Sequence, residues 1–248
     1  MKAPPRLLCA TLPRDVGVVR LDEASAHHAR VLRVKPSDRV VLFDGRGREA
    51  HGVVRAIVAS SFEIDVSSTG YADALLRGRL VLVQAWPKAD KLEIIVRMAT
   101  ELGVNEVRGV DSQHVVVRAE AERRARRLQR LTRIAEEAAR QSGRADVPAV
   151  LDGGALGDAL AAAPPTAARW IAHERADRRL SDEARSNGAT PEAWIAVGPE
   201  GGFAPDEVRC AEELGWSAVR LAPSVLRVET AAPAALVLAL QALWSQSR

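Results

Sequence analysis

Two segments near the C-terminus combine glycines, carboxylates and an arginine in patterns that suit a ligand-binding site. The first, Trp194–Phe203, reads WIAVGPEGGF, and the second, Leu221–Ala231, reads LAPSVLRVETA. Each segment is a short apolar run that breaks into a turn and is followed by a helical pattern. In an open α/β sheet, ligands bind at the carboxyl ends of strands, where such turns lie. These two turns are therefore the candidate site.

The residue types in these turns leave more than one interpretation open. Glycines let the backbone approach a ligand closely, and the first turn has three: Gly198, Gly201 and Gly202. Arg227 and Glu229 lie in an apolar neighbourhood just before a helix, where charges usually need a partner or a function. The glycine turn could instead be a simple chain reversal, and Arg227 with Glu229 a buried structural pair. Neither a dinucleotide fingerprint nor a phosphate-binding loop occurs anywhere in the chain.

Alternating strands and helices are predicted to position these turns. Apolar runs predict strands at 80–86, 104–110, 147–151, 169–173, 193–197 and 217–221. Helical spacing predicts helices near 89–102, 120–141, 155–162, 205–215 and 230–245. The polar stretch 175–190 is expected to be a mobile loop. Strand, helix and strand in succession favour an α/β fold with a parallel sheet.

The first 70 residues predict a smaller, β-rich domain. A helix is expected at about 23–34, capped by Asp22, and strands at 39–43, 49–59 and 62–68. The Asp44-Gly45-Arg46-Gly47 turn is a hairpin signal. Short strands with one small helix suggest a compact barrel, a shape often used on RNA. We place the domain boundary after residue 72, which leaves 73–248 for the α/β domain.

Composition and charge limit the class of protein and its partners. Net charge is only +3, but basic residues gather at 6–55 and again at 118–144, which could be RNA-facing or ordinary solvated surfaces. No apolar run reaches the roughly 18 residues of a membrane span, and a signal-peptide core is absent, so we expect a cytoplasmic protein without membrane contact. Two cysteines and scattered histidines predict neither a disulfide framework nor a metal site. The final helix is apolar on more than one face, which suggests deep burial or a subunit interface.

Together, the two C-terminal segments resemble the SPOUT methyltransferases, which fold as a deep trefoil knot. They are most similar to the RsmE family, which methylates N3 of a uracil in 16S ribosomal RNA. The family pattern is close to GPEGG…E followed by LG.R.LR.ETA, and here the first part is Gly198–Gly202 with Glu207. The second part is Leu221, Leu226-Arg227 and Glu229–Ala231.

The resemblance extends over nearly the whole chain, with four departures. Further matches are His28–Val34 with Val41–Gly45, like the family's N-terminal PUA-like domain, and Thr100–Val104, Glu137–Ala139, Gln141–Arg144 and Pro148. Departures from the family pattern are Ser37, Met98, Ala222 and Ser224. Alanine at 222 fits if its φ is negative, whereas Ser224 removes a charge that the family usually has.

The resemblance implies S-adenosylmethionine as the methyl donor, held largely by backbone groups of three loops. The expected contacts lie in those loops: His173, Gly198, Gly201, Leu221 and Leu226. A poorly nucleophilic uracil N3 needs its proton removed and its ring oxygens stabilised. We expect Arg227 to supply the cation and Glu229 or Glu200 to orient it or accept the proton.

The implied partners are RNA and a second copy of the chain. Contacts to 16S rRNA or the small ribosomal subunit are expected from Arg6, Arg30, Arg33, Lys35, Gln141 and Arg144. Gln141 and Arg144 could equally cap the helix that they end. The family is homodimeric, which favours the interface interpretation of the final helix. The alternatives are a non-catalytic RNA-binding or ribosome-assembly module, favoured by Ala222 and Ser224, and a SPOUT enzyme that acts on another RNA.

Overall fold

The chain divides into two compact units. A computed structural model describes residues 3–58, 61–73, 78–88, 90–114, 121–186 and 190–244. Internal contacts group Met1–Leu75 with Glu136–Val147 as the smaller unit, and Leu76–Ala135 with Pro148–Arg248 as the larger one. The smaller unit thus includes a segment from the middle of the chain. A division into functional domains at residue 72 stays a prediction.

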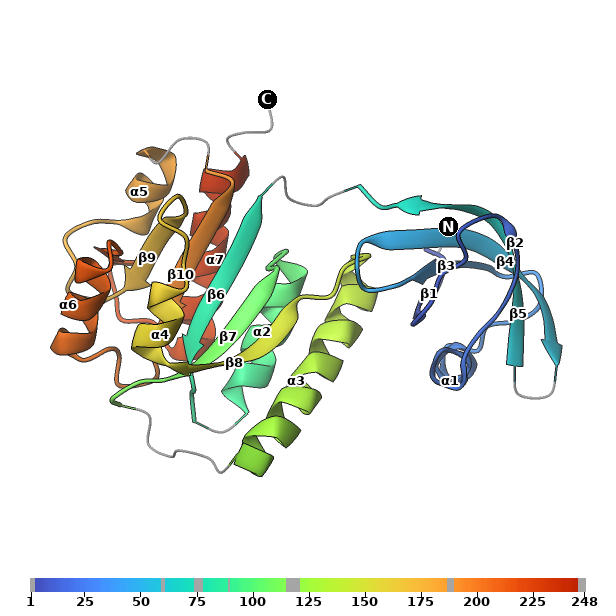
Figure 1. Cartoon of the computed structure of the whole chain (residues 1–248), viewed down its shortest axis with the longest axis horizontal. Helices are drawn as coiled ribbons and strands as arrows, with labels where there is room; N and C mark the ends of the chain where they lie inside the picture. Colours follow the sequence, from blue (N-terminus) through green and yellow to red (C-terminus); the bar gives the residue numbers. More distant parts are fainter. Residues whose placement is uncertain are drawn as a thin grey trace. The chain divides into compact units, whose positions relative to one another are not determined.

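The smaller unit contains a five-stranded sheet, one complete helix and the C-terminal end of the long helix α3 (Ala121–Ser142) (Figure 1). Its elements are β1 (Arg6–Leu8), β2 (Gly17–Arg20), α1 (Glu23–Val31), β3 (Arg39–Phe43), β4 (Arg48–Val58) and β5 (Ser61–Tyr71). The strand order is β1-β3-β4-β5-β2, antiparallel except for the β1–β3 pair. The Asp22 side chain accepts a hydrogen bond from Ser25 N and so caps α1 as predicted. Strand β2 was not predicted, because most of its side chains are exposed.

The larger unit is built on a six-stranded parallel sheet. Its strands are β6 (Arg79–Ala85), β7 (Glu106–Asp111), β8 (Ala149–Ala155), β9 (Ala168–Ala172), β10 (Glu192–Val197) and β11 (Ser217–Val219). The order is β11-β9-β10-β6-β7-β8, and every neighbouring pair is parallel. The connecting helices are α2 (Lys91–Glu101), α3 (Ala121–Ser142), α4 (Leu156–Ala161), α5 (Leu180–Ser186), α6 (Pro205–Glu213) and α7 (Val228–Trp244). The predicted parallel sheet is confirmed.

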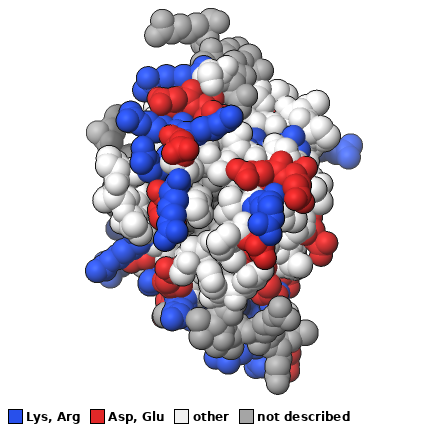
Figure 2. Space-filling view, turned by 90° about the vertical axis from the view of Figure 1, so that its left-hand side faces the viewer, with Lys and Arg blue, Asp and Glu red and all other residues white. Residues whose placement is uncertain are grey.

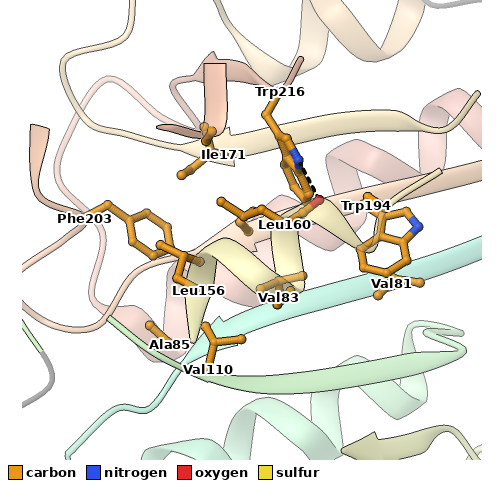
Figure 3. Close-up of a cluster of buried hydrophobic side chains, with 14 of the residues drawn as sticks. Val81, Val83, Ala85, Val110, Leu156, Leu160, Ile171, Trp194, Phe203 and Trp216 are labelled. Carbon is orange, nitrogen blue, oxygen red and sulfur yellow. Dashed lines mark hydrogen bonds between the residues drawn. The ribbon is translucent and has the colours of Figure 1, made fainter. Parts of the chain in front are cut away.

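Helices cover the sheet of the larger unit, and this covering explains why its central strands are almost continuously apolar. On one face, α4 and α6 pack over a cluster that includes Val83, Trp194 and Trp216 (Figure 3). The indole Nε1 of Trp216 donates to the carbonyl of Leu160 at 3.2 Å, which satisfies this buried N–H. Helix α7 packs against β6 and β10 and also contacts α2 and α5.

Helix α5 corrects the prediction of a mobile loop over 175–190. Leu180 and Ala184 are four residues apart, both are fully buried, and α5 packs against α7. The Leu180 N–H also donates to the carbonyl of Arg220 at 3.1 Å, which ties the segment to the end of β11. These two buried apolar residues hold a short helix against α7. They are too few to give the repeated apolar spacing by which a helix is predicted from sequence. Residues 187–189 of the predicted loop lie outside the described residues.

Helix α7 is mostly an interior element. Along its length, most apolar side chains are buried within the larger unit, Ala231, Ala234 and Leu238 are partly exposed, and Val237 is 47% exposed. Among the residues that the structure describes, no helix has the length and apolar character needed to cross a membrane. Deep burial, one of the two interpretations of this apolar helix, therefore accounts for most of its length.

Candidate active site

A single pocket brings together all the residues predicted for cofactor binding and catalysis. It has a volume of about 500 Å³ and lies in the larger unit, where β9, β10 and β11 end. Its lining includes the five predicted cofactor contacts, His173, Gly198, Gly201, Leu221 and Leu226. It also includes the three predicted catalytic residues, Glu200, Arg227 and Glu229. The parallel sheet thus gathers loops from distant parts of the chain at one edge, and the roles of these residues stay predictions.

The glycine turn that follows β10 is tightly packed. Gly202 has a φ of +69°, and its N–H donates to the carbonyl of Pro199 at 2.9 Å, so this turn needs a residue that tolerates a left-handed backbone. An added Cβ at Gly198 would come within 3.0 Å of the backbone carbonyl carbon of Gly202. The turn therefore favours glycine at both positions, at Gly202 because of its φ and at Gly198 because of the limited space.

Two neighbouring strands anchor this turn from the side. Gln84, fully buried near the end of β6, donates from Nε2 to the carbonyls of Val197 and Gly198 at 3.2 and 3.3 Å. His114, beyond β7, lies with Nδ1 3.1 Å from the carbonyl of Gly202. These contacts hold backbone carbonyls at the end of β10 and in the turn that follows it. The turn is therefore held in place from β6 and from the segment after β7.

The second loop leads into α7 with Arg227 at its start. The Arg227 carbonyl accepts hydrogen bonds from Thr230 N and Ala231 N at 2.9 and 2.7 Å, so its backbone begins the helix. Its side chain is exposed and forms no ion pair with another residue of the described chain. The alternative of a buried Arg227–Glu229 pair is therefore wrong. Ala222 is not among the described residues with positive φ, so alanine fits where the family usually has glycine.

Lys91 is a residue of the site that the sequence analysis missed. It is the first residue of α2, and its Nζ lies 3.0 Å from Glu200 Oε1 and 3.5 Å from Glu229 Oε2. The Lys88 N–H also donates to both oxygens of Glu200, at 3.1 and 3.3 Å. A weak signal was present, because Lys91 follows β6 at the same sheet edge as the two motifs. Nothing local in the sequence pairs it with either carboxylate.

These contacts change the acid–base behaviour of the pair. The hydrogen bond with Glu200 raises the pKa of Lys91. Burial raises the pKa of Glu200, but the hydrogen bonds from Lys91 and from Lys88 N outweigh burial, and the net pKa is lowered. Both side chains therefore carry their charges at neutral pH.

The residues predicted to contact RNA fall into two groups in the smaller unit. Arg30, Arg33, Lys35 and Gln141 are exposed. Arg33 has a φ of +55°, and beside it Val31 and Leu32 are also exposed. Their exposure is compatible with contacts to RNA, and these contacts stay a prediction.

Arg144 is a buried structural group, which corrects its assignment as an RNA contact, whereas Arg6 is partly exposed and its RNA contact stays a prediction. Arg144 is 2% exposed, and its NH2 atom lies 2.5 Å from Asp146 Oδ2. Arg6 pairs with Glu49 at 3.1 Å, donates to the carbonyl of Arg144 at 3.2 Å and lies over the ring of Phe43. The buried guanidinium of Arg144 is therefore not accessible to phosphates.

Charge is not segregated on the face of the molecule drawn in Figure 2. Lysines and arginines lie next to aspartates and glutamates across that view. In the larger unit, several arginines of α3 are similarly paired, for example Arg126 with Glu122 at 3.3 Å and Arg130 with Glu93 at 2.9 Å. The predicted salt-bridged, solvated surface is therefore present for part of the basic stretch 118–144.

Comparisons with known proteins match both parts of the chain. Residues 75–240 match a family model described as an RNA methyltransferase domain, and residues 21–66 match one described as an RNA methyltransferase PUA domain. Ribosomal RNA small subunit methyltransferase E of Mycobacterium tuberculosis is 34% identical over 239 residues, which cover 91% of this chain and 87% of the relative. The protein of the same name from Bacillus subtilis is 28% identical, with coverage of 83% and 82%.

A solved structure extends the similarity to three dimensions. The ribosomal RNA small subunit methyltransferase E of Neisseria gonorrhoeae, solved with bound S-adenosyl methionine, is 29% identical. It has a TM-score of 0.85, covering 95% of this chain and 96% of that one. The predicted fold class, a SPOUT domain with a PUA-like domain, is confirmed. Sequence and structure agree that the chain belongs to the RsmE family of SPOUT RNA methyltransferases, the ribosomal RNA small subunit methyltransferases E.

Proposed function

We propose that this chain transfers a methyl group from S-adenosylmethionine to N3 of a specific uracil in the 16S rRNA of the small ribosomal subunit. The observation that carries the proposal is the pocket at the end of β9, β10 and β11. It collects the glycine turn and the Arg227–Glu229 segment of a chain that belongs to the RsmE family. This proposal adds the donor, the RNA and the target atom to the family membership.

The residues present suit the proposed cofactor. A volume of about 500 Å³ lies within the range of about 300–1,000 Å³ that is usual for small-molecule sites. Leu221 and Leu226 offer apolar surface for an adenosine, and the backbone near Gly198 and Gly201 is open to close contact. When bound, S-adenosylmethionine would supply an electrophilic methyl group on a positively charged sulfur.

The chain's own groups would prepare the uracil. N3 carries a proton at neutral pH, so it becomes a good nucleophile only as that proton leaves. The exposed guanidinium of Arg227 would stabilise the negative charge that then builds on the ring oxygens. Holding the base in line with the methyl group contributes the rest of the rate increase.

Glu229 suits the role of proton acceptor better than Glu200. Both oxygens of Glu200 accept hydrogen bonds from Lys88 N, and its lowered pKa makes it a weak base. Oε2 of Glu229 is buried, and its contact is a longer ion pair with the Lys91 ammonium at 3.5 Å. A carboxylate held by one longer ion pair keeps more capacity to accept a proton than one that also accepts backbone hydrogen bonds.

Isothermal titration with S-adenosylmethionine tests the cofactor assignment. We expect one site per chain. Absence of binding at millimolar ligand would instead favour the non-catalytic RNA-binding or assembly module, and Ala222 and Ser224, which both line the pocket, would be the first positions to revert.

Arg227→Ala tests the catalytic assignment. The variant should keep cofactor binding and lose roughly 100-fold or more in methylation rate, as for other preorganised charge-stabilising groups. Arg175→Ala, which alters an exposed arginine outside the pocket lining, is the matched control. Full activity of Arg227→Ala would remove this residue from the mechanism.

The smaller unit is proposed to bind rRNA through Arg30, Arg33 and Lys35. Each phosphate contact contributes about 0.7 to the slope of log affinity against log salt for single strands, so the triple alanine variant should lower that slope by roughly 2. Arg20→Ala is the control, because Glu63 already neutralises Arg20 at 3.0 Å. An unchanged slope in the triple variant would exclude this surface from binding.

We also propose that two copies associate through α2 and α7. An apolar groove runs between these helices and is lined by Met98, Leu102, Pro233, Val237 and Leu238, among others. Its apolar side chains would be covered in a dimer. Val237→Glu should give a monomer by light scattering, and an unchanged mass would refute this interface. We propose a cytoplasmic location, because the proposed substrate is ribosomal RNA.

A further inference from the structure

Lys91 joins two parts of the site that are far apart in sequence. Its ammonium lies 3.0 Å from Glu200 Oε1, in the turn between β10 and α6, and 3.5 Å from Glu229 Oε2, in the first turn of α7. Lys91 itself begins α2, more than a hundred residues earlier. All three side chains line the same pocket. The Lys91 side chain therefore links the glycine turn after β10 to the start of α7.

The two carboxylates depend on Lys91 to different extents. Glu200 also accepts hydrogen bonds from Lys88 N at 3.1 and 3.3 Å, so it keeps a partner if Lys91 is removed. Oε2 of Glu229 has no hydrogen bond, and the Lys91 ammonium is its nearby charge. Loss of Lys91 would leave two carboxylates in one pocket without the cation between them. Like charges in such a site repel, and the start of α7 would move away from the glycine turn.

We propose that Lys91 is a positioning residue for methyl transfer, which holds the start of α7, and with it Arg227, in register with the glycine turn. This role rests on the proposed function and deepens it. Lys91 acts through Glu200 and Glu229 and does not touch the reacting atoms. Because Arg227 lies two residues before Glu229, a shift of Glu229 also displaces the guanidinium proposed to stabilise the uracil.

A purely structural role would have a different signature. The side chains of Lys91, Glu200 and Glu229 are each about a quarter to a third exposed, at 32%, 27% and 24%. Ion pairs as accessible as these add little to the stability of a fold. A displacement of reacting groups by a fraction of an ångström, in contrast, has a large effect on rate. The proposal therefore predicts a functional loss without a matching loss of stability.

The first test compares three variants of the full-length protein. Lys91→Ala should raise the Kd for S-adenosylmethionine roughly fivefold, lower kcat roughly tenfold or more, and leave the melting temperature within about 2 °C. Lys91→Arg, which keeps the positive charge, should recover most of both losses. Lys88→Ala is the matched control: its exposed side chain forms no hydrogen bond or ion pair with Glu200, whereas its backbone N–H, which donates to Glu200, is retained. It should bind the cofactor within twofold of the wild type.

A double-mutant cycle between Lys91→Ala and Glu229→Gln identifies the route of the effect. If Lys91 acts through Glu229, the losses in kcat should be clearly less than additive in free energy. Additive losses, or a Lys91→Ala protein with wild-type Kd and kcat, would overturn the positioning role. So would a fall in melting temperature that accounts for the lost activity. A wild-type chain that binds no S-adenosylmethionine would overturn the proposed function itself, and the role of Lys91 with it.

Discussion

Replacement of Gly198 by alanine tests whether the turn after β10 forms the wall of the cofactor pocket. The φ of Gly198 is not in the left-handed region, so the effect of the substitution is steric alone. An ideal Cβ at this position would lie 3.0 Å from the carbonyl carbon of Gly202. It would also lie 3.1 Å from Gly202 Cα and 3.1 Å from Phe203 N.

The size of the effect follows from these distances. Ordinary contacts between carbon atoms are about 3.5–4.0 Å, so the new methyl group is too close by roughly half an ångström. The obstructing atoms belong to the backbone, and the turn itself must therefore open. Overpacking of this kind costs about 1–3 kcal/mol. If the substitution weakens the free energy of cofactor binding by about 1.4 kcal/mol, the Kd for S-adenosylmethionine rises about tenfold.

Calorimetric titration of Gly198→Ala, with thermal unfolding measured in parallel, gives the result directly. Gly157→Ala is the matched control, because its Cβ would have no neighbour within 4 Å and its φ is not positive. Gly157 lies in helix α4, so alanine there should stabilise the protein by about 0.5–1 kcal/mol and leave the Kd unchanged. A Gly198→Ala protein that binds the cofactor within twofold of the wild type would refute the assignment of this turn to the pocket wall.

Three further predictions use other parts of the chain. Arg144→Ala should lower the free energy of unfolding by about 2 kcal/mol in urea titrations, because it removes a buried, hydrogen-bonded guanidinium; a loss under 0.5 kcal/mol would contradict its structural role. Burial raises the pKa of the Cys9 thiol to about 11, so a thiol reagent at pH 8 should label only exposed Cys210 quickly, and two fast thiols would disprove this. The net pKa of Glu200 is lowered by folding, so its stabilising contribution is present above the ordinary value of about 4.3 and is lost as pH falls through the lowered value. The difference in melting temperature between wild type and Glu200→Gln should therefore be constant from about pH 5 to 8 and shrink toward pH 3, and a difference that grows on acidification would contradict the pairing.

Much of the larger unit was predictable because its central strands are buried on both faces. The apolar run 193–197 differs from β10 by a single residue, since a fully covered parallel strand needs apolar side chains throughout. Helix α6 was predictable from Pro205 at its first position and the acidic residues after it. Helix α5 was missed because only Leu180 and Ala184 distinguish it from a polar loop.

The site was only partly predictable, for reasons of topology and burial. The two motifs identified the glycine turn and the Arg227 loop, but the pairing of Lys91 with Glu200 and Glu229 arises only when the sheet brings α2 beside them. Local sequence also does not distinguish an exposed arginine from a buried one. Arg144, at the end of a basic helix, reads like a phosphate contact, yet its guanidinium turns inward to Asp146.

Product mapping after methylation tests the central claim most directly. The purified chain would be incubated with S-adenosylmethionine and small ribosomal subunits, or their rRNA, from a strain that lacks the corresponding modification. The rRNA would then be digested to nucleosides for mass spectrometry. We predict the appearance of 3-methyluridine with the wild-type chain and its loss with Arg227→Ala. Transfer of the methyl group to another nucleoside, or no transfer by a chain that binds the cofactor, would contradict the proposed reaction.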